Sequence, residues 1–275
     1  MNPLPDFWKH RVAAHPKAET FVLIDAAMQP LFADRVIARS DVRSLLPQAP
    51  KEARDLGPWL LPAAIAVELG IDGCGRGVNW LLSEYSMDAL ATHLTNWTSV
   101  ALPDEASRCY IRIADGRVLR SLAMIWSSQQ AALFFAPFAA WCVADRDGLG
   151  LCVPVLVHEA VQSRMANPSD ARLSRDQYRR LLDTSRADQL LQDLKGFAQL
   201  HPDWGSRESR YRAAVDALQL ARRFDYDDPE DAMTIVARVL QRGASQLMTL
   251  AGHPAVIARQ HGARFWAALI EDSDA

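Results

Sequence analysis

The chain has 275 residues, 49% of them hydrophobic and 23% charged, which is typical of a folded globular protein and excludes a wholly disordered chain. Its formal net charge is −3, from 30 basic and 33 acidic residues, so the sequence indicates neither a nucleic-acid partner nor an anionic membrane surface. The longest apolar run, residues 131–144, is too short to cross a bilayer, and the N-terminus lacks the apolar segment of a secretory signal. We therefore expect a cytoplasmic protein that does not contact membranes.

The N-terminal part of the chain alternates strands and helices. After a leader of residues 1–18, the run Phe21-Val22-Leu23-Ile24 is continuously apolar and ends at Asp25, which is typical of a central strand covered on both faces. Further elements are expected in this order: a helix over 30–39, an apolar run over 57–61, a short helix over 63–69, a loop over 70–77, a strand over 78–82 and a helix over 87–97. The pattern favours an α/β domain over residues 19–156, with a mixed β-sheet and an antiparallel edge.

A strand expected over residues 109–114 runs directly into a helix. Every second residue is apolar and faces one side of the strand, and the residues between them face the other side, which is a period of two. Asp115 ends the strand, and its carboxylate is well placed to cap the helix expected over most of 118–134. A hairpin of residues 141–143 and 151–153 follows.

From about residue 157 the expected elements are helices only. Ser174 and Gln177 fit a capping box that opens the first of them, and Asp228 fits the N-cap of the third. A last helix is expected after residue 254. The sequence therefore predicts an all-α C-terminal lobe over residues 157–275.

No residue pattern announces a chemical reaction. The histidines are scattered and the cysteines lack CxxC spacing, so we expect free thiols, no metal, no cofactor and no catalytic residue. His93 lies on an apolar helix face, which favours a hydrogen-bonded core histidine. The glycine-rich run 73–77 precedes a strand rather than a helix, and this favours a flexible turn over a phosphate loop. Arg112 and Arg117 flank Asp115 and either bind an anion or pair internally; the internal pair is favoured.

The run Arg112-Ile113-Ala114-Asp115-Gly116-Arg117-Val118-Leu119 resembles the central signature of the bacterial type VI secretion adaptor family, long catalogued as a domain of unknown function. Gly116 stands where that family usually has proline, and Ile113 where an aromatic residue is common. Other elements follow in the family's order over residues 19–147: Leu23-Ile24-Asp25-Ala26, Gly57-Pro58-Trp59-Leu60, Leu81-Leu82-Ser83 before Leu90, His93 and Leu94, and Gln129 with Leu133-Phe134 and Trp141.

The resemblance implies binding rather than catalysis. Members of the family are cytoplasmic chaperones that hold a toxic effector and help to load it onto the C-terminal region of the secretion spike protein VgrG. Under this interpretation Asp25, Arg112, Asp115 and Arg117 are framework residues or possible binding residues, and the helical lobe supplies a cargo-specific surface. Trp204 is the candidate partner contact on that lobe, although a tryptophan in a loop also commonly seals a domain core.

Two other classes of protein stay open at this point. One is a small α/β enzyme that acts on a nucleotide or an anionic small molecule through the turn 73–77 and Arg112. It predicts a concave polar pocket in which these groups converge. The other is a protein-interaction module whose partner is unrelated to secretion.

Overall fold

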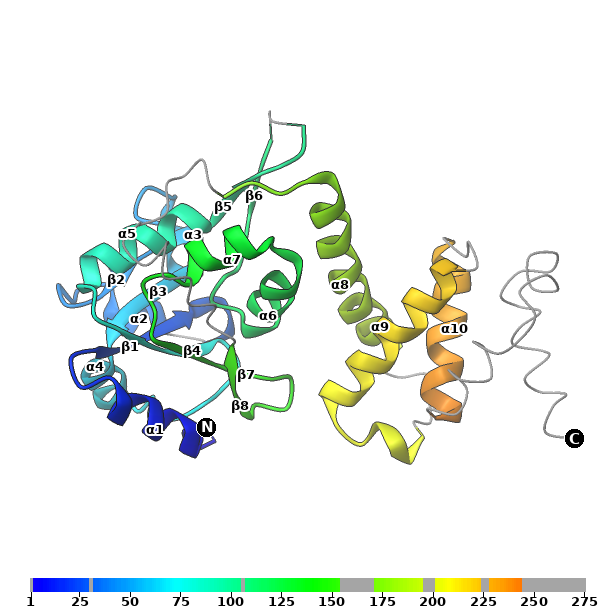
Figure 1. Cartoon of the computed structure of the whole chain (residues 1–275), viewed down its shortest axis with the longest axis horizontal. Coiled ribbons are helices and arrows are strands. Elements are labelled where there is room, and N and C mark those ends of the chain that lie inside the picture. Colours follow the sequence, from blue (N-terminus) through cyan, green and yellow to red (C-terminus); the bar gives the residue numbers. More distant parts are fainter. Residues whose placement is uncertain are drawn as a thin grey trace, which may run out of the picture. The chain divides into compact units, whose positions relative to one another are not determined.

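The chain forms two compact units that divide between Leu181 and Leu182. The computed structural model describes residues 2–29, 32–104, 107–153, 171–194, 201–223 and 228–243. The first unit, called the α/β unit here, contains the sheets; the second, the helical unit, contains helices throughout its described residues (Figure 1). This confirms the predicted fold class. The boundary predicted at 156/157 and the helix predicted after residue 254 both lie outside the described residues.

A six-stranded sheet in the order β2-β3-β1-β4-β7-β8 is the centre of the α/β unit (Figure 1). Its strands are β1 (Glu19–Asp25), β2 (Arg43–Ser44), β3 (Pro58–Pro62), β4 (Val78–Ser83), β7 (Ala140–Ala144) and β8 (Gly150–Val153). Every pairing is antiparallel, so the antiparallel arrangement predicted for the β7–β8 edge extends across the whole sheet. At the centre of the sheet, β3 and β4 lie on opposite sides of β1, and each is antiparallel to it.

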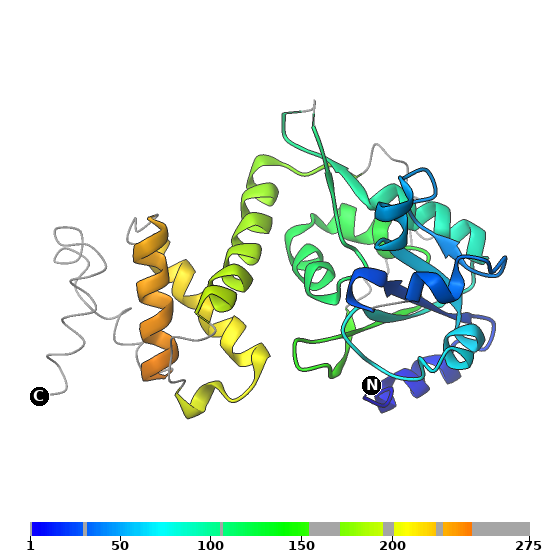
Figure 2. The same cartoon turned by 180° about the vertical axis from the view of Figure 1, so that it is seen from behind.

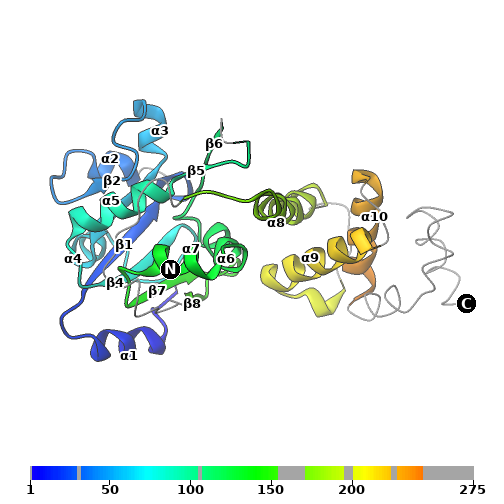
Figure 3. The same ribbon diagram turned by 45° about the horizontal axis from the view of Figure 1, so that its top comes forward.

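Both faces of this sheet are covered, as predicted from the continuous apolar run in β1. Val22 and Ile24 face a core built with α1 (Asp6–Ala14), α2 (Phe32–Val36) and α4 (Ala63–Glu68). Phe21 and Leu23 face the opposite core, which includes residues of α5 (Met87–Trp97), α6 (Gly116–Ile125) and α7 (Ser128–Phe135). Figure 3 shows α1 on the other side of the sheet from α5 and α7. The short helices α3 (Lys51–Asp55) and η1 (Ala26–Met28) complete the connections between strands.

A separate two-stranded sheet pairs β5 (Ser99–Ala101) with β6 (Arg108–Tyr110). The strand predicted over 109–114 is therefore shorter than expected, because it ends at Tyr110. Beyond it the chain turns into the core, where the amide of Ile111 donates to the carbonyl of Thr98 at 2.8 Å. Ile111 and Ile113 stay buried as the alternation predicted, although they are no longer in a strand.

Residues 171–181 belong to the α/β unit. The amide of Ala101 donates to the carbonyl of Ala171 at 2.9 Å, and the amide of Leu173 donates back to Ala101 at 3.0 Å. The predicted capping box forms at Ser174 and Gln177, and the Gln177 amide group also donates to the carbonyl of Ile125 at 3.1 Å. The start of α8 (Arg175–Asp193) is thus fixed to the end of α6.

The helical unit continues α8 and adds η3 (Pro202–Trp204), α9 (Arg207–Arg223) and α10 (Pro229–Arg242). Figure 2 shows α9 and α10 side by side, and their apolar faces form one core with that of α8. Asp228 caps α10 as predicted, accepting from the amides of Glu230 and Asp231 at 2.8 and 3.3 Å.

Candidate functional site

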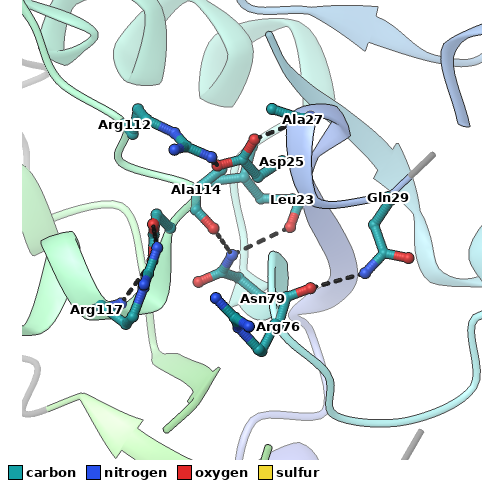
Figure 4. Close-up of polar contacts among 10 residues, drawn as sticks. Leu23, Asp25, Ala27, Gln29, Arg76, Asn79, Arg112, Ala114 and Arg117 are labelled. Atoms are coloured by element: carbon teal, nitrogen blue, oxygen red, sulfur yellow. Dashed lines mark hydrogen bonds and ion pairs between the residues drawn. The ribbon is translucent and has the colours of Figure 1, made fainter. Parts of the chain in front are cut away.

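Asp25 and Arg112 form the first of two ion pairs with a buried carboxylate near the carboxyl end of β1 (Figure 4). The Asp25 side chain is only 5% exposed, and its Oδ2 accepts from Nη2 and Nε of Arg112 at 2.7 and 3.2 Å. Its Oδ1 accepts from the amide of Ala27 at 3.2 Å. The pair therefore ties the end of the central strand to the segment that precedes α6, 87 positions further along the chain.

The electrostatics of Asp25 are set by two opposing effects. Burial disfavours the carboxylate and raises its pKa, and the charge and hydrogen bonds of Arg112 offset only part of this. The net pKa is raised. Arg112 itself remains 39% exposed, so one end of its guanidinium side chain reaches the surface.

Asp115 and Arg117 form the second pair. Asp115 is the N-cap residue of α6, as predicted, and its Oδ1 accepts from the Arg117 amide at 3.0 Å. The Arg117 guanidinium contacts both carboxylate oxygens, with Nε to Oδ1 at 3.0 Å and Nη2 to Oδ2 at 2.7 Å. Burial alone would raise the pKa of Asp115, but these bonds and the charge of Arg117 outweigh burial and lower it. Each arginine of the stretch thus pairs with a different aspartate.

Asn79 lies between the two pairs and was not identified from the sequence. It is fully buried in β4, where its Nδ2 donates to the carbonyls of Ala114 at 2.6 Å and Leu23 at 3.3 Å (Figure 4). Its Oδ1 accepts from Nε1 of Trp141 at 3.3 Å. The signal was present, since a lone amide inside an apolar strand must find buried hydrogen-bond partners.

The glycine-rich turn 73–77 packs against the same end of β1. Gly77 has φ of +73°, and its carbonyl accepts from the Asp25 amide at 2.8 Å. The carbonyls of Arg76 and Gly73 accept from side chains of Gln29 at 2.7 Å and Trp80 at 3.1 Å. These inward-facing groups are carbonyl oxygens, whereas a phosphate loop presents N–H groups to its anion. The turn therefore acts as a structural support for β1.

Gly116, the first residue of α6, lies directly against β7. A Cβ atom there would lie 2.9 Å from Cβ of Val143 and 3.0 Å from the carbonyl oxygen of Ala144. The helix N-terminus that Asp115 caps can approach β7 this closely only because position 116 has no side chain.

Tyr110 is the exposed residue of this region that sequence reasoning missed. Its side chain is 47% exposed at the end of β6. Burial of the hydroxyl end and the nearby negative charge of Asp25 raise the pKa of Tyr110 to about 12, so the phenol stays neutral. Tyr110 and Arg112 therefore place an aromatic and a cationic side chain at the surface, next to the buried carboxylate of Asp25.

The structure gives Trp204 and His93 core positions. Trp204 is 8% exposed within the helical unit, and its Nε1 donates to the carbonyl of Val239 at 3.0 Å. This is the alternative in which the tryptophan seals the core, and a buried indole cannot serve as an exposed anchor. His93 is fully buried as predicted, with Nε2 2.8 Å from the carbonyl oxygen of Phe134. Burial lowers the pKa of His93 to about 4.

The fold and the site together define an α/β unit with a covered antiparallel sheet, whose charged signature residues pair with one another, followed by a helical unit. Residues 20–133 match the model of a family described as Domain of unknown function (DUF4123). The match runs from β1 into α7 and includes both ion pairs. Neither the curated proteins nor the solved structures contain a match.

Two further observations concern the described residues only. None of their helices combines the length and the apolar character needed to cross a membrane. Their histidine, cysteine and acidic side chains form no group of three or more that could hold a metal ion.

Proposed function

We propose that this protein is an adaptor, or chaperone, that binds an effector of a type VI secretion system and helps to load it onto the C-terminal region of the VgrG spike protein. The observation that carries this proposal is the match of residues 20–133 to the DUF4123 family, which is associated with type VI effectors. The resemblance carried by residues 112–119 and by the elements before and after them points the same way.

The proposal is one of binding rather than catalysis, and the use of the charged residues supports it. Asp25 and Asp115 are buried, and each carboxylate already accepts from an arginine and from a backbone amide. Groups satisfied in this way hold the end of β1, the segment before α6 and the α6 N-terminus in one arrangement. We therefore assign them a framework role.

A partner contact requires exposed side chains, and Tyr110 with Arg112 meets this requirement next to the framework. Tyrosine and arginine are enriched among the residues that dominate protein interfaces, because both combine a large contact area with hydrogen bonding. We propose Tyr110 as the contact on the α/β unit in place of Trp204.

Co-expression tests the proposal. The tagged protein is produced with the large open reading frame next to its gene, purified through the tag and analysed by size exclusion with mass determination. A stable complex of the two, which then captures the C-terminal region of VgrG, is the expected result. Recovery of the protein alone, together with a neighbour that is soluble without it, would refute the effector-binding role.

Tyr110→Ala makes the test specific to the surface. Because the side chain is half exposed, the variant should fold normally and weaken effector binding at least about tenfold. Val67→Ala on α4 is the matched control, since Val67 is 55% exposed, and it should bind like the wild type. Equal binding by all three proteins would exclude Tyr110 as a contact while leaving the co-expression result to decide the function.

A further inference from the structure

Three of the four cysteines gather at one side of the sheet. Sγ of Cys74 lies 3.8 Å from Sγ of Cys142, and both residues are buried, at 1% and 0% exposure. Cys142 is directly opposite Cys152 in the β7–β8 pairing, so these two side chains share a face of the sheet. Cys152 is exposed, unlike the other two. One exposed cysteine, whose Sγ lies 3.5 Å from the carbonyl oxygen of Val153, thus adjoins a buried pair.

The loop that carries Cys74 is held in place over this hairpin. The backbone of Cys74 exchanges two hydrogen bonds with Asn2, at 2.9 and 2.6 Å, and the Asn2 side chain donates to the carbonyl of Gly148 at 2.8 Å. Gly150 lies so close that a Cβ there would be 2.6 Å from Sγ of Cys74. The short Sγ–Sγ distance is therefore part of a fixed arrangement of the loop and the β7–β8 hairpin.

We propose that Cys74, Cys142 and Cys152 form a thiol–disulfide exchange site for low-molecular-weight disulfides of the glutathione type. The Cys152 thiolate attacks one sulfur of the small disulfide, the S–S bond breaks, and one small thiolate leaves. Cys142 then passes its proton to the thiolate form of Cys74 and attacks Sγ of Cys152, and the second small thiolate leaves. Finally Cys74, after losing that proton to solvent, attacks Sγ of Cys142 and releases Cys152 as a thiolate.

The sum of these steps balances. Two protein thiols are oxidised to the Cys74–Cys142 disulfide, one small disulfide is reduced to two small thiols, and Cys152 is regenerated. An excess of the reduced small thiol reverses the sequence through the same intermediates. The bond would join the loop 70–77, whose Gly77 supports Asp25, to β7.

The three thiols differ in acidity, and the order of the steps rests on their positions in the fold. A hydrogen bond from the Cys142 thiol lowers the pKa of Cys74, so Cys74 is the member of the buried pair that ionises and takes up a proton. The same contact and burial raise the pKa of Cys142. Burial raises the pKa of Cys152, and the positive charge of Arg11 opposes this shift.

The test treats the full chain with oxidised glutathione, alkylates the remaining thiols and maps the product by intact mass and peptide analysis. The expected product links Cys74 to Cys142, retains no glutathione and carries two alkyl groups, whereas the reduced protein carries four. Glutathione left on Cys152 with the buried pair still reduced would overturn the proposal, as would no reaction or a disulfide that includes Cys109.

Two comparisons test the relay. Cys152→Ser should form the Cys74–Cys142 bond at least about tenfold more slowly, because the buried pair has lost its exposed entry thiol. Cys109→Ser, which changes a cysteine on β6 outside the group, should react like the wild type. Selective alkylation of Cys152 in the folded wild type gives the same information without a variant. Unchanged rates after both treatments would exclude the role of Cys152.

Discussion

The buried His93 should make the stability of the α/β unit fall as the pH drops from about 6.5 toward 4. Its ring is enclosed by Phe134 and Phe138 and hydrogen-bonded to the Phe134 carbonyl oxygen. Burial lowers its pKa from 6.5 to about 4. Between these values the folded protein holds a neutral imidazole, whereas the unfolded chain binds a proton.

The sign and size of the effect follow from this difference. The contribution of neutral His93 is complete above pH 6.5 and is lost as the pH falls toward 4, because protons then favour the unfolded chain. The linkage relation gives a loss of about 2 kcal/mol of unfolding free energy between pH 7.5 and pH 5. For a unit of ordinary stability, this is a large fraction of the total.

Urea titrations at pH 7.5, 6 and 5 measure this loss through tryptophan fluorescence. His93→Gln removes the titrating ring and should show a pH dependence about 2 kcal/mol smaller than the wild type over that interval. His10→Gln, which changes an exposed histidine on α1, should keep the wild-type dependence. If wild type and His93→Gln lose the same stability, or if the His93 ring titrates near 6.5 by NMR, the reasoning is wrong.

Three further predictions concern the frame of the α/β unit. Gly116→Ala should lower the free energy of unfolding by about 1–3 kcal/mol in a urea titration, because β7 leaves no room for a Cβ atom. Gly205→Ala is the control: its Cβ would have its nearest neighbour at 3.8 Å, so the loss should be less than about 0.5 kcal/mol. Equal losses in the two variants would contradict the packing argument. Asp115→Ala should lose about 1 kcal/mol or more, and Asp115→Ser should recover the capping part, as measured by thermal unfolding. A chain of residues 1–183 should elute as a monomer on size exclusion, whereas a chain of residues 1–156, which lacks residues 171–181 of the α/β unit, should aggregate. A chain of residues 1–156 that is monomeric and unfolds cooperatively would show that the α/β unit does not need residues 171–181.

The sequence predicted local structure well wherever a single physical signal was strong. The continuous apolar run of β1 predicted a central strand, and capping residues placed the starts of α6, α8 and α10. The short helix α4 and the β7–β8 hairpin were also found at the expected residues. These features depend on neighbours within a few positions, so the chain itself contains the necessary information.

The failures involve pairings between distant segments. The sequence shows that arginines flank Asp115, but it gives no indication that Arg112 pairs with Asp25, which lies 87 positions earlier in the chain. The strand β5 was missed because its three residues pair only with β6 and with residues near 172. A helix expected over 118–134 is broken before Ser127, whose capping box with Gln130 starts α7.

Trp204 and Tyr110 illustrate why exposed contact residues are harder to predict from sequence than the residues that hold the fold together. Both are aromatic residues outside long helices, and the sequence alone does not separate an indole that donates to Val239 in a core from a tyrosine that is 47% exposed. Burial depends on which elements fold over a residue, and that is a tertiary property. Only the structure distinguishes the two.

The residues that carry the family resemblance are largely those whose side chains are used inside the fold. Asp25 pairs with Arg112 and Asp115 pairs with Arg117. Gly116, which stands where the family usually has proline, permits the close approach of α6 to β7. A signature of this kind specifies how β1, α6 and β7 meet, so proteins that share it can share a fold while binding different partners. The choice of partner must then depend on side chains outside the signature, and this is why Tyr110→Ala is a more direct test of the proposed adaptor function than any substitution of the aspartates.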